Sequence, residues 1–151
     1  MTLTQKEHSL LTDLKGAEEL CIEKYTRYAA EAHDQSLKGL FNKIKETEQS
    51  HLQSINQMMA GEEVKLDTPP SAISALENVQ PSALPKNQKD EDAFLCKDAL
   101  SMEKHVSSVY DTSVFEFKNP TLRDTLASIQ KQEQNHGEVI YNYMHVNGMY
   151  S

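Results

Sequence analysis

The sequence has little cysteine, no tryptophan and no long apolar run. Its 151 residues include two cysteines, Cys21 and Cys96, and no Cys-x-x-Cys pair. This number is too small for a disulfide framework, and reduced thiols agree with synthesis in the cytoplasm. No apolar run approaches the roughly 20 residues of a transmembrane helix, and the first residues lack the apolar segment of a secretory signal. We therefore expect no membrane insertion.

Basic residues are also in the minority. The chain has 15 Lys and Arg against 23 Asp and Glu, which gives a net charge of −8. A negative chain is repelled by phosphate backbones and by anionic lipids, so nucleic acid is not an expected partner. A chain of this length is expected to fold as one domain, residues 1–151, with a core of its own.

Proline is scarce outside one stretch. Four of the five prolines, Pro69, Pro70, Pro81 and Pro85, fall within residues 62–89. A long loop in a small domain needs a reason. It could be a flexible linker between two separate helical hairpins, or a crossover that runs the length of a bundle. We favour the crossover because neither hairpin alone could cover its apolar stripe. Its own apolar residues would then pack on the bundle surface; these are Ile73, Leu76, Val79 and Leu84.

Apolar residues at helical spacing predict four helices, at about residues 5–32, 35–59, 90–117 and 120–146. Thr4 with Glu7 is typical of a capping box, Asp34 of an N-cap, and Asn119 followed by Pro120 of a helix start. The connections within each pair are short, so each pair should be an antiparallel hairpin. The predicted fold is an all-α four-helix bundle with a long crossover.

Two apolar stripes are interrupted by the same pair of polar residues. Glu48 and His51 lie on the buried face of the second predicted helix, and Glu133 and His136 occupy the same places in the fourth. The two pairs are 85 residues apart, which indicates a duplicated hairpin. A buried carboxylate costs several kcal/mol unless something pairs with it. The same offset relates Glu18 to Glu103 and Tyr25 to Tyr110.

Packed around one core, four carboxylates and two imidazoles would converge at mid-length. The predicted ligands are Glu18, Glu48, His51, Glu103, Glu133 and His136. Two divalent cations would neutralise the carboxylates, and this donor set suits iron or manganese, and also zinc. In the alternative interpretation, the motifs lie on solvated faces of an ordinary bundle. Tyr25 and Tyr110 would contact the ligands as hydrogen-bond donors or radical carriers, or would be ordinary core residues.

Three neighbours of these motifs bear on the site. Thr47 and Gln132 precede the two motif glutamates and are neutral, so no carboxylate is evident that could support the histidines. Gly137 follows His136 inside a predicted helix, where glycine is unfavourable by up to about 1 kcal/mol. One interpretation of Gly137 is the close approach of another backbone.

The pattern resembles the ferritin-like di-metal carboxylate proteins, which combine one Glu from each of two helices with Glu-x-x-His from each of two others. The resemblance implies a ferritin-like bundle. Residues 119–126, 133–136, 140–144 and 147–150 are also similar to the spore coat F family of spore-forming bacteria. That resemblance implies a place in the spore coat and no particular reaction. Metal ions, a second copy of the chain and other coat proteins are the partners to expect.

Two functions therefore stay open. The first is a di-iron or di-manganese protein that handles oxygen or peroxide, because open metal positions allow such chemistry. The second is a structural coat protein whose metal site only stabilises the bundle or is empty. Whether the chain is an enzyme is left undecided by the sequence.

Overall fold

Four α-helices make up the regular secondary structure of the residues that the structure, a computed structural model, describes: 2–66 and 79–150. They are α1 (Gln5–Glu31), α2 (Gln35–Met59), α3 (Lys86–Glu116) and α4 (Pro120–Val146). The all-α prediction is therefore confirmed for the described part of the chain. Adding 85 to the first residues of α1 and α2 gives 90 and 120, so α2 and α4 begin at equivalent positions and α3 begins one turn early.

Side-chain caps start three of the helices. Thr4 accepts a hydrogen bond from the backbone N–H of Glu7 at 3.1 Å, and Glu7 accepts one from the Thr4 N–H at 3.0 Å. Asp34 and Asn119 accept from backbone N–H groups in the first turns of α2 and α4. These bonds satisfy backbone N–H groups that have no partner within the helix. The starts of these three helices can therefore be predicted accurately from the sequence.

The start of α3 differs from the expectation of about residue 90. The helix begins at Lys86 after Pro85, whose side chain makes no capping hydrogen bond. The Pro85 carbonyl accepts from the N–H groups of Gln88 and Lys89 at 3.1 and 3.0 Å. Proline has its φ fixed near the helical value and donates no N–H, so it can precede a helix without a polar cap.

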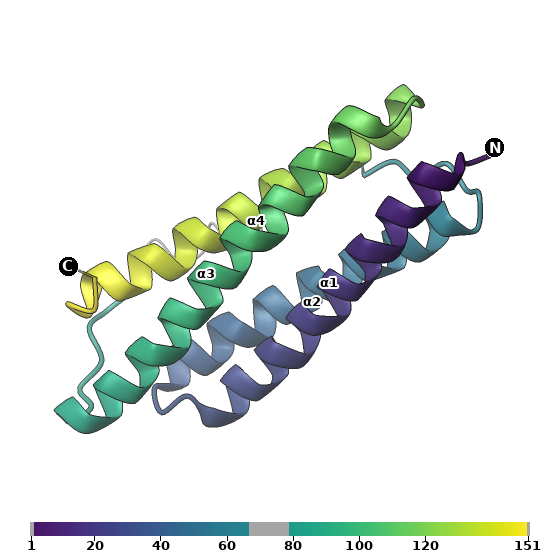
Figure 1. Ribbon diagram of the computed structural model, residues 1–151. Coiled ribbons are helices and arrows are strands. Elements are labelled where there is room, and N and C mark those ends of the chain that lie inside the picture. Colours follow the sequence, from purple (N-terminus) through teal and green to yellow (C-terminus); the bar gives the residue numbers. More distant parts are fainter. Residues whose placement is uncertain (1, 67–78, 151) are drawn as a thin grey trace.

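The chain reverses direction between the two helices of each hairpin, but it runs in the same direction in the last helix of the first hairpin and the first helix of the second (Figure 1). α1 and α2 are antiparallel, as are α3 and α4, while α2 and α3 run in the same direction. The end of α2 and the start of α3 therefore lie at opposite ends of the bundle, as the crossover interpretation requires. Pro69, Pro70, Ile73 and Leu76 lie outside the described residues.

The described ends of the crossover attach to α4. Thr125 donates its hydroxyl to the carbonyl of Val64, and the N–H of Ser82 donates to Asn147 Oδ1 at 2.8 Å. Val79 is partly buried against the core, as predicted, and Leu84 is also partly buried. The two ends of the crossover thus rest on the surface of the bundle.

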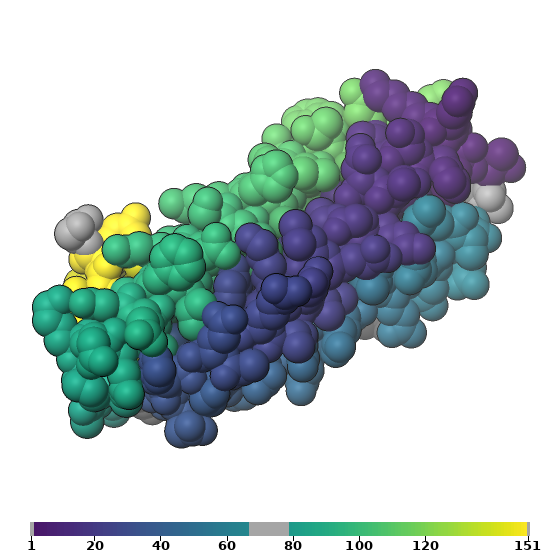
Figure 2. Space-filling view, turned by 60° about the horizontal axis from the view of Figure 1, so that its bottom comes forward, coloured from purple at the N-terminus to yellow at the C-terminus, as the bar shows by residue number. Residues whose placement is uncertain are grey.

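The helices form a ring in which α1 contacts α2 and α3, and α4 contacts α3 and α2. Figure 2 shows one side of this ring, where α1 lies between α2 and α3. The apolar core runs between the four helices and contains residues of each, including Leu14, Ile44, Val106 and Ile140. Among the described residues, no helix is long and apolar enough to cross a membrane.

A buried carboxylate on α3 joins the two hairpins at one end of the bundle. Asp92, which is fully buried, accepts from the backbone N–H of His33 at 2.8 Å and of Asp34 at 3.0 Å. Tyr143 of α4 donates its hydroxyl to Asp34 at 2.6 Å. The turn between α1 and α2 is thereby held by side chains from α3 and α4.

Candidate metal centre

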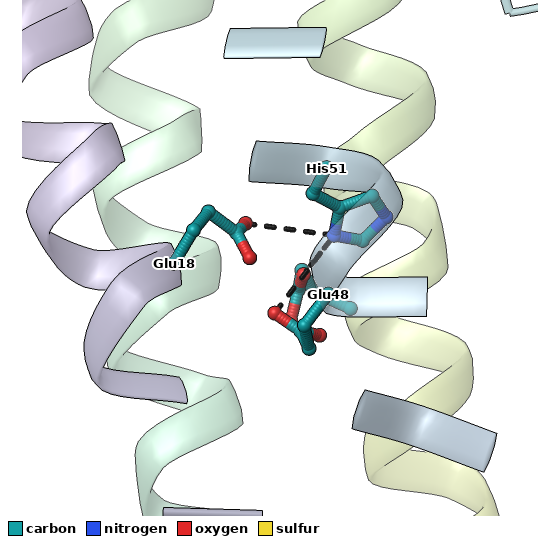
Figure 3. A group of neighbouring side chains, drawn as sticks. Glu18, Glu48 and His51 are labelled. Atoms are coloured by element: carbon teal, nitrogen blue, oxygen red, sulfur yellow. Dashed lines mark ion pairs between the residues drawn. The ribbon is translucent and has the colours of Figure 1, made fainter. Parts of the chain in front are cut away.

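All six predicted ligands lie in the interior of the bundle, and none is more than 2 % exposed. α1 and α3 each contribute one carboxylate, while α2 and α4 each contribute a carboxylate and an imidazole one turn apart. Figure 3 shows how Glu18 of α1 and the pair Glu48 and His51 of α2 point toward one another. The helix spacing in the sequence is sufficient to bring the six side chains to one level.

The ligand atoms fall into two overlapping groups of four, and each group could hold one metal ion. Within a group, one ligand atom from each residue lies within 4.8 Å of the others. Glu48 and Glu133 belong to both groups and are placed to bridge two ions. The first group adds Glu18 and His51, and the second adds Glu103 and His136.

The two groups are related by the internal duplication. His51 Nδ1 lies 2.8 Å from a Glu133 oxygen and 3.5 Å from Glu18. His136 Nδ1 lies 2.9 Å from a Glu48 oxygen and 3.3 Å from Glu103. Each imidazole therefore directs the same nitrogen into the cluster, toward the bridging carboxylate of the opposite hairpin.

Most of the polar atoms in this cluster have no hydrogen-bond partner. They are both oxygens of Glu48 and Glu133, one oxygen each of Glu18 and Glu103, and Nδ1 of both histidines. The short nitrogen–oxygen approaches thus lack hydrogen-bond geometry. Buried polar atoms are normally paired, and leaving one unpaired costs about 1–3 kcal/mol. Oxygen and imidazole donors aimed at a common centre fit two divalent cations.

Tyr25 and Tyr110 donate hydrogen bonds across the bundle to the two carboxylates that each belong to one ligand group, Glu103 and Glu18. Tyr110 of α3 donates its hydroxyl to Glu18 Oε1 at 2.5 Å, and Tyr25 of α1 donates to Glu103 Oε1. Burial and the nearby carboxylates raise the pKa of both tyrosines well above its ordinary value, so both hydroxyls keep their protons. In both Glu18 and Glu103, one carboxylate oxygen accepts the tyrosine hydroxyl and the other oxygen could bind an ion.

Burial and mutual repulsion keep protons on this cluster. Desolvation, followed by the charge of Glu18, raises the pKa of Glu48 to about 7. Desolvation and the charge of Glu133 raise the pKa of Glu103 to about 8. Burial by itself lowers the pKa of His51 and His136, but the surrounding carboxylates outweigh burial and raise it well above the ordinary value. Near pH 7 the metal-free cluster can thus approach neutrality with protons on both imidazoles and on two carboxyls.

The metal-free protein should become less stable as pH rises from 5 to 8. A raised folded-state pKa means that the folded state binds more protons than the unfolded state. The stability contributed by Glu48 and Glu103 is then full below about 4.5 and is lost as pH passes about 7 and about 8. Thermal melting in chelator measures this dependence. The variant Glu48→Gln/Glu103→Gln should show a shallower fall, and an equal slope in both proteins would contradict the assignment.

The role of one polar residue, Gln132, was not predicted from the sequence. Its side-chain oxygen contacts His51 Nε2, the nitrogen that faces away from the cluster. A proton on Nε2 would donate to this oxygen and leave Nδ1 free to bind a metal. The equivalent nitrogen of His136 is buried without a partner. The available signal was the position of Gln132, one residue before Glu133 on a helix that faces α2.

The structure also defines the surroundings of two residues near the cluster, Cys21 and Gly137. Burial and the charge of Glu48 raise the pKa of Cys21, so this residue is a neutral thiol and no thiolate competes for the ions. Among the described residues outside its own helical turns, a Cβ on Gly137 would meet Leu100 Cδ1 alone, at 3.6 Å. That neighbour is a side chain and not a backbone, so the interpretation was wrong for the described part of the chain.

Comparison with known proteins gives one match. Residues 91–151 match the Coat F domain, which indicates a spore coat protein and supports the resemblance seen in the sequence. The match spans most of α3 and all of α4, and so includes Glu103, Glu133 and His136. No curated protein and no solved structure matches the chain.

Proposed function

We propose that this chain is a ferritin-like di-metal carboxylate protein of the spore coat, which binds two divalent cations between its hairpins. The observation that carries the proposal is the pair of overlapping ligand groups, most of whose buried oxygens and nitrogens have no hydrogen-bond partner among the described residues. Four carboxylates balance the charge of two divalent ions. Carboxylate and imidazole donors without thiolate favour iron or manganese, and zinc also fits.

Each ligand has a distinct task in this proposal. Glu48 and Glu133, which belong to both ligand groups, would hold both ions, while Glu18 and Glu103 would each hold one. His51 and His136 bind through Nδ1. The hairpins contribute equally, so ions at this level would cross-link α1–α2 to α3–α4 and stabilise the folded state.

Iron or manganese bound here would supply redox chemistry toward oxygen or peroxide. The chain would supply a dry interior, fixed carboxylates and two tyrosine hydroxyls within hydrogen-bond reach of ligand oxygens. The Coat F match favours a second candidate, a structural coat protein in which the ions only strengthen the bundle. The two candidate functions use the same metal site, but only the first includes a catalysed reaction of oxygen or peroxide.

Metal binding should be stoichiometric and should release protons. We expect protein purified without chelator, or refilled with Mn(II) or Fe(II), to hold two ions per chain by elemental analysis. Each ion should displace protons from the imidazoles and from Glu48 and Glu103, detected with a pH indicator in weak buffer. The variant His51→Ala/His136→Ala should bind less metal and release fewer protons.

A peroxide-decay assay on the loaded protein separates the two candidate functions. Decay that requires metal and is lost in the double histidine variant supports oxygen or peroxide handling. Two bound ions without turnover support the structural role. Failure to bind any divalent ion, in protein that melts cooperatively, would refute the metal site itself.

A further inference from the structure

A surface pocket between α3 and α4 lies beside the proposed metal centre, and two of the proposed ligands line it. It has a volume of about 370 Å³, and its lining includes Glu103, Glu133, Ser107 and Gly137. Glu103 and Glu133 are 2 % and 1 % exposed, whereas Glu18 and Glu48 are fully buried. The pocket therefore lies beside the second ligand group.

The corresponding face of the α1–α2 hairpin carries different residues. The offset of 85 relates Gly137 to Leu52, Gln134 to Gln49 and Ser107 to Ile22. A hollow of about 410 Å³ is lined by Gln49 and Leu52, but none of the six ligands lines it. A leucine and an isoleucine thus stand in the α1–α2 hairpin where α3–α4 has glycine and serine.

The two histidines also differ in the partner of the imidazole nitrogen that faces away from the cluster. His51 Nε2 contacts the Gln132 oxygen, whereas His136 Nε2 has no hydrogen-bond partner among the residues that the structure describes. The offset relates Gln132 to Thr47, whose hydroxyl donates instead to the carbonyl of Lys43 at 3.3 Å. A partner on the outer nitrogen fixes the orientation of a metal-binding imidazole, and its loss typically weakens metal affinity about 10–100-fold.

We propose that the two ion positions differ in function, and this rests on the proposed metal site. The position with His51 and Glu18 is closed and holds its ion tightly. The position with His136 and Glu103 exchanges its ion, and accepts small water-borne ligands, through the pocket between α3 and α4. The small residues at Gly137 and Ser107 keep that entrance open.

Removal of Co(II) by excess EDTA tests the proposal without an activity assay. Protein loaded with two Co(II) ions should lose its visible absorption in two phases of equal amplitude. The variant Gly137→Leu should fill the pocket and slow the fast phase by about tenfold, the effect of about 1.4 kcal/mol of added barrier. The amount of Co(II) bound should be unchanged. Gly39→Leu is the matched control, because Gly39 is exposed on α2 with no atom near a new Cβ.

Two variants test the histidine support directly. Gln132→Leu should accelerate the slow phase about 10–100-fold, and Thr47→Gln should slow the fast phase by supplying a partner for His136. A single phase in the wild type would overturn the proposal, as would equal fast rates in Gly137→Leu and Gly39→Leu. Either result would leave the metal site standing if two ions are bound. Absence of Co(II) binding would refute the proposed function, and this inference with it.

Discussion

Replacing Glu48 and Glu133 together by glutamine should raise the melting temperature of the metal-free protein at pH 7 and remove most of its response to metal. The variant retains two carboxylates opposite two imidazoles, so the cluster can be neutral without protonated carboxyls. The penalty expressed in the raised pKa of Glu48 is then absent. Relief of about 1 kcal/mol would raise melting by about 2–4 °C in a domain of this size.

Added metal should stabilise the wild type more than the variant. An ion present at 100 times its dissociation constant, and bound only by the folded state, adds about 2.7 kcal/mol. This corresponds to a rise of about 5–10 °C for the wild type. The variant lacks both bridging carboxylates, so its gain should be less than half as large. Melting curves in EDTA, Mn(II) and Fe(II) measure both effects.

The control is a second pair of Glu→Gln changes that alters the net charge equally. Glu46 and Glu138 lie on the same two helices and are exposed, so Glu46→Gln/Glu138→Gln should melt like the wild type with and without metal. If metal leaves the wild type unchanged, and the Glu48→Gln/Glu133→Gln variant is simply less stable, the carboxylates are not a metal site.

Helix positions could be predicted from the sequence wherever local chemistry determines them. Thr4, Asp34 and Asn119 cap helices with their own side chains, and each cap is readable in a few adjacent residues. The start of α3 was not readable in this way, because Pro85 precedes the helix without any side-chain hydrogen bond. The direction of the crossover followed from packing, since each hairpin has an apolar face that only the other can cover.

The convergence of the six site residues could also be predicted, because helical spacing and the 85-residue offset place them at one level. The differences between the two ligand groups could not be predicted. Gln132 and Thr47 are both neutral in the sequence, and only the packing of α4 against α2 brings Gln132 to His51. The pocket depends likewise on the contact between α3 and α4, where the lack of a side chain on Gly137 matters. Such asymmetry arises from small residue differences within a symmetrical frame.

The replacement Asp92→Ala should cause a large loss of stability at a position outside the proposed metal centre. Asp92 accepts from the backbone N–H groups of His33 and Asp34, at 2.8 and 3.0 Å, and is fully buried. Hydrogen bonds to a charged group are worth about 1.5–3 kcal/mol each, so losing both should cost about 3–5 kcal/mol. The melting temperature should fall by about 10 °C.

The role of Asp92 separates bundle stability from metal binding. Asp90→Ala is the matched control, because Asp90 is exposed on the same helix and pairs only with exposed Lys86 among the described residues. It should melt within about 2 °C of the wild type, since exposed pairs contribute at most about 1 kcal/mol. Asp92→Asn keeps one carbonyl acceptor and should lie between the two. All three variants should bind the same number of ions, because the turn between α1 and α2 contributes no ligand. A melting temperature of Asp92→Ala equal to that of Asp90→Ala would show that the two hairpins do not depend on this carboxylate.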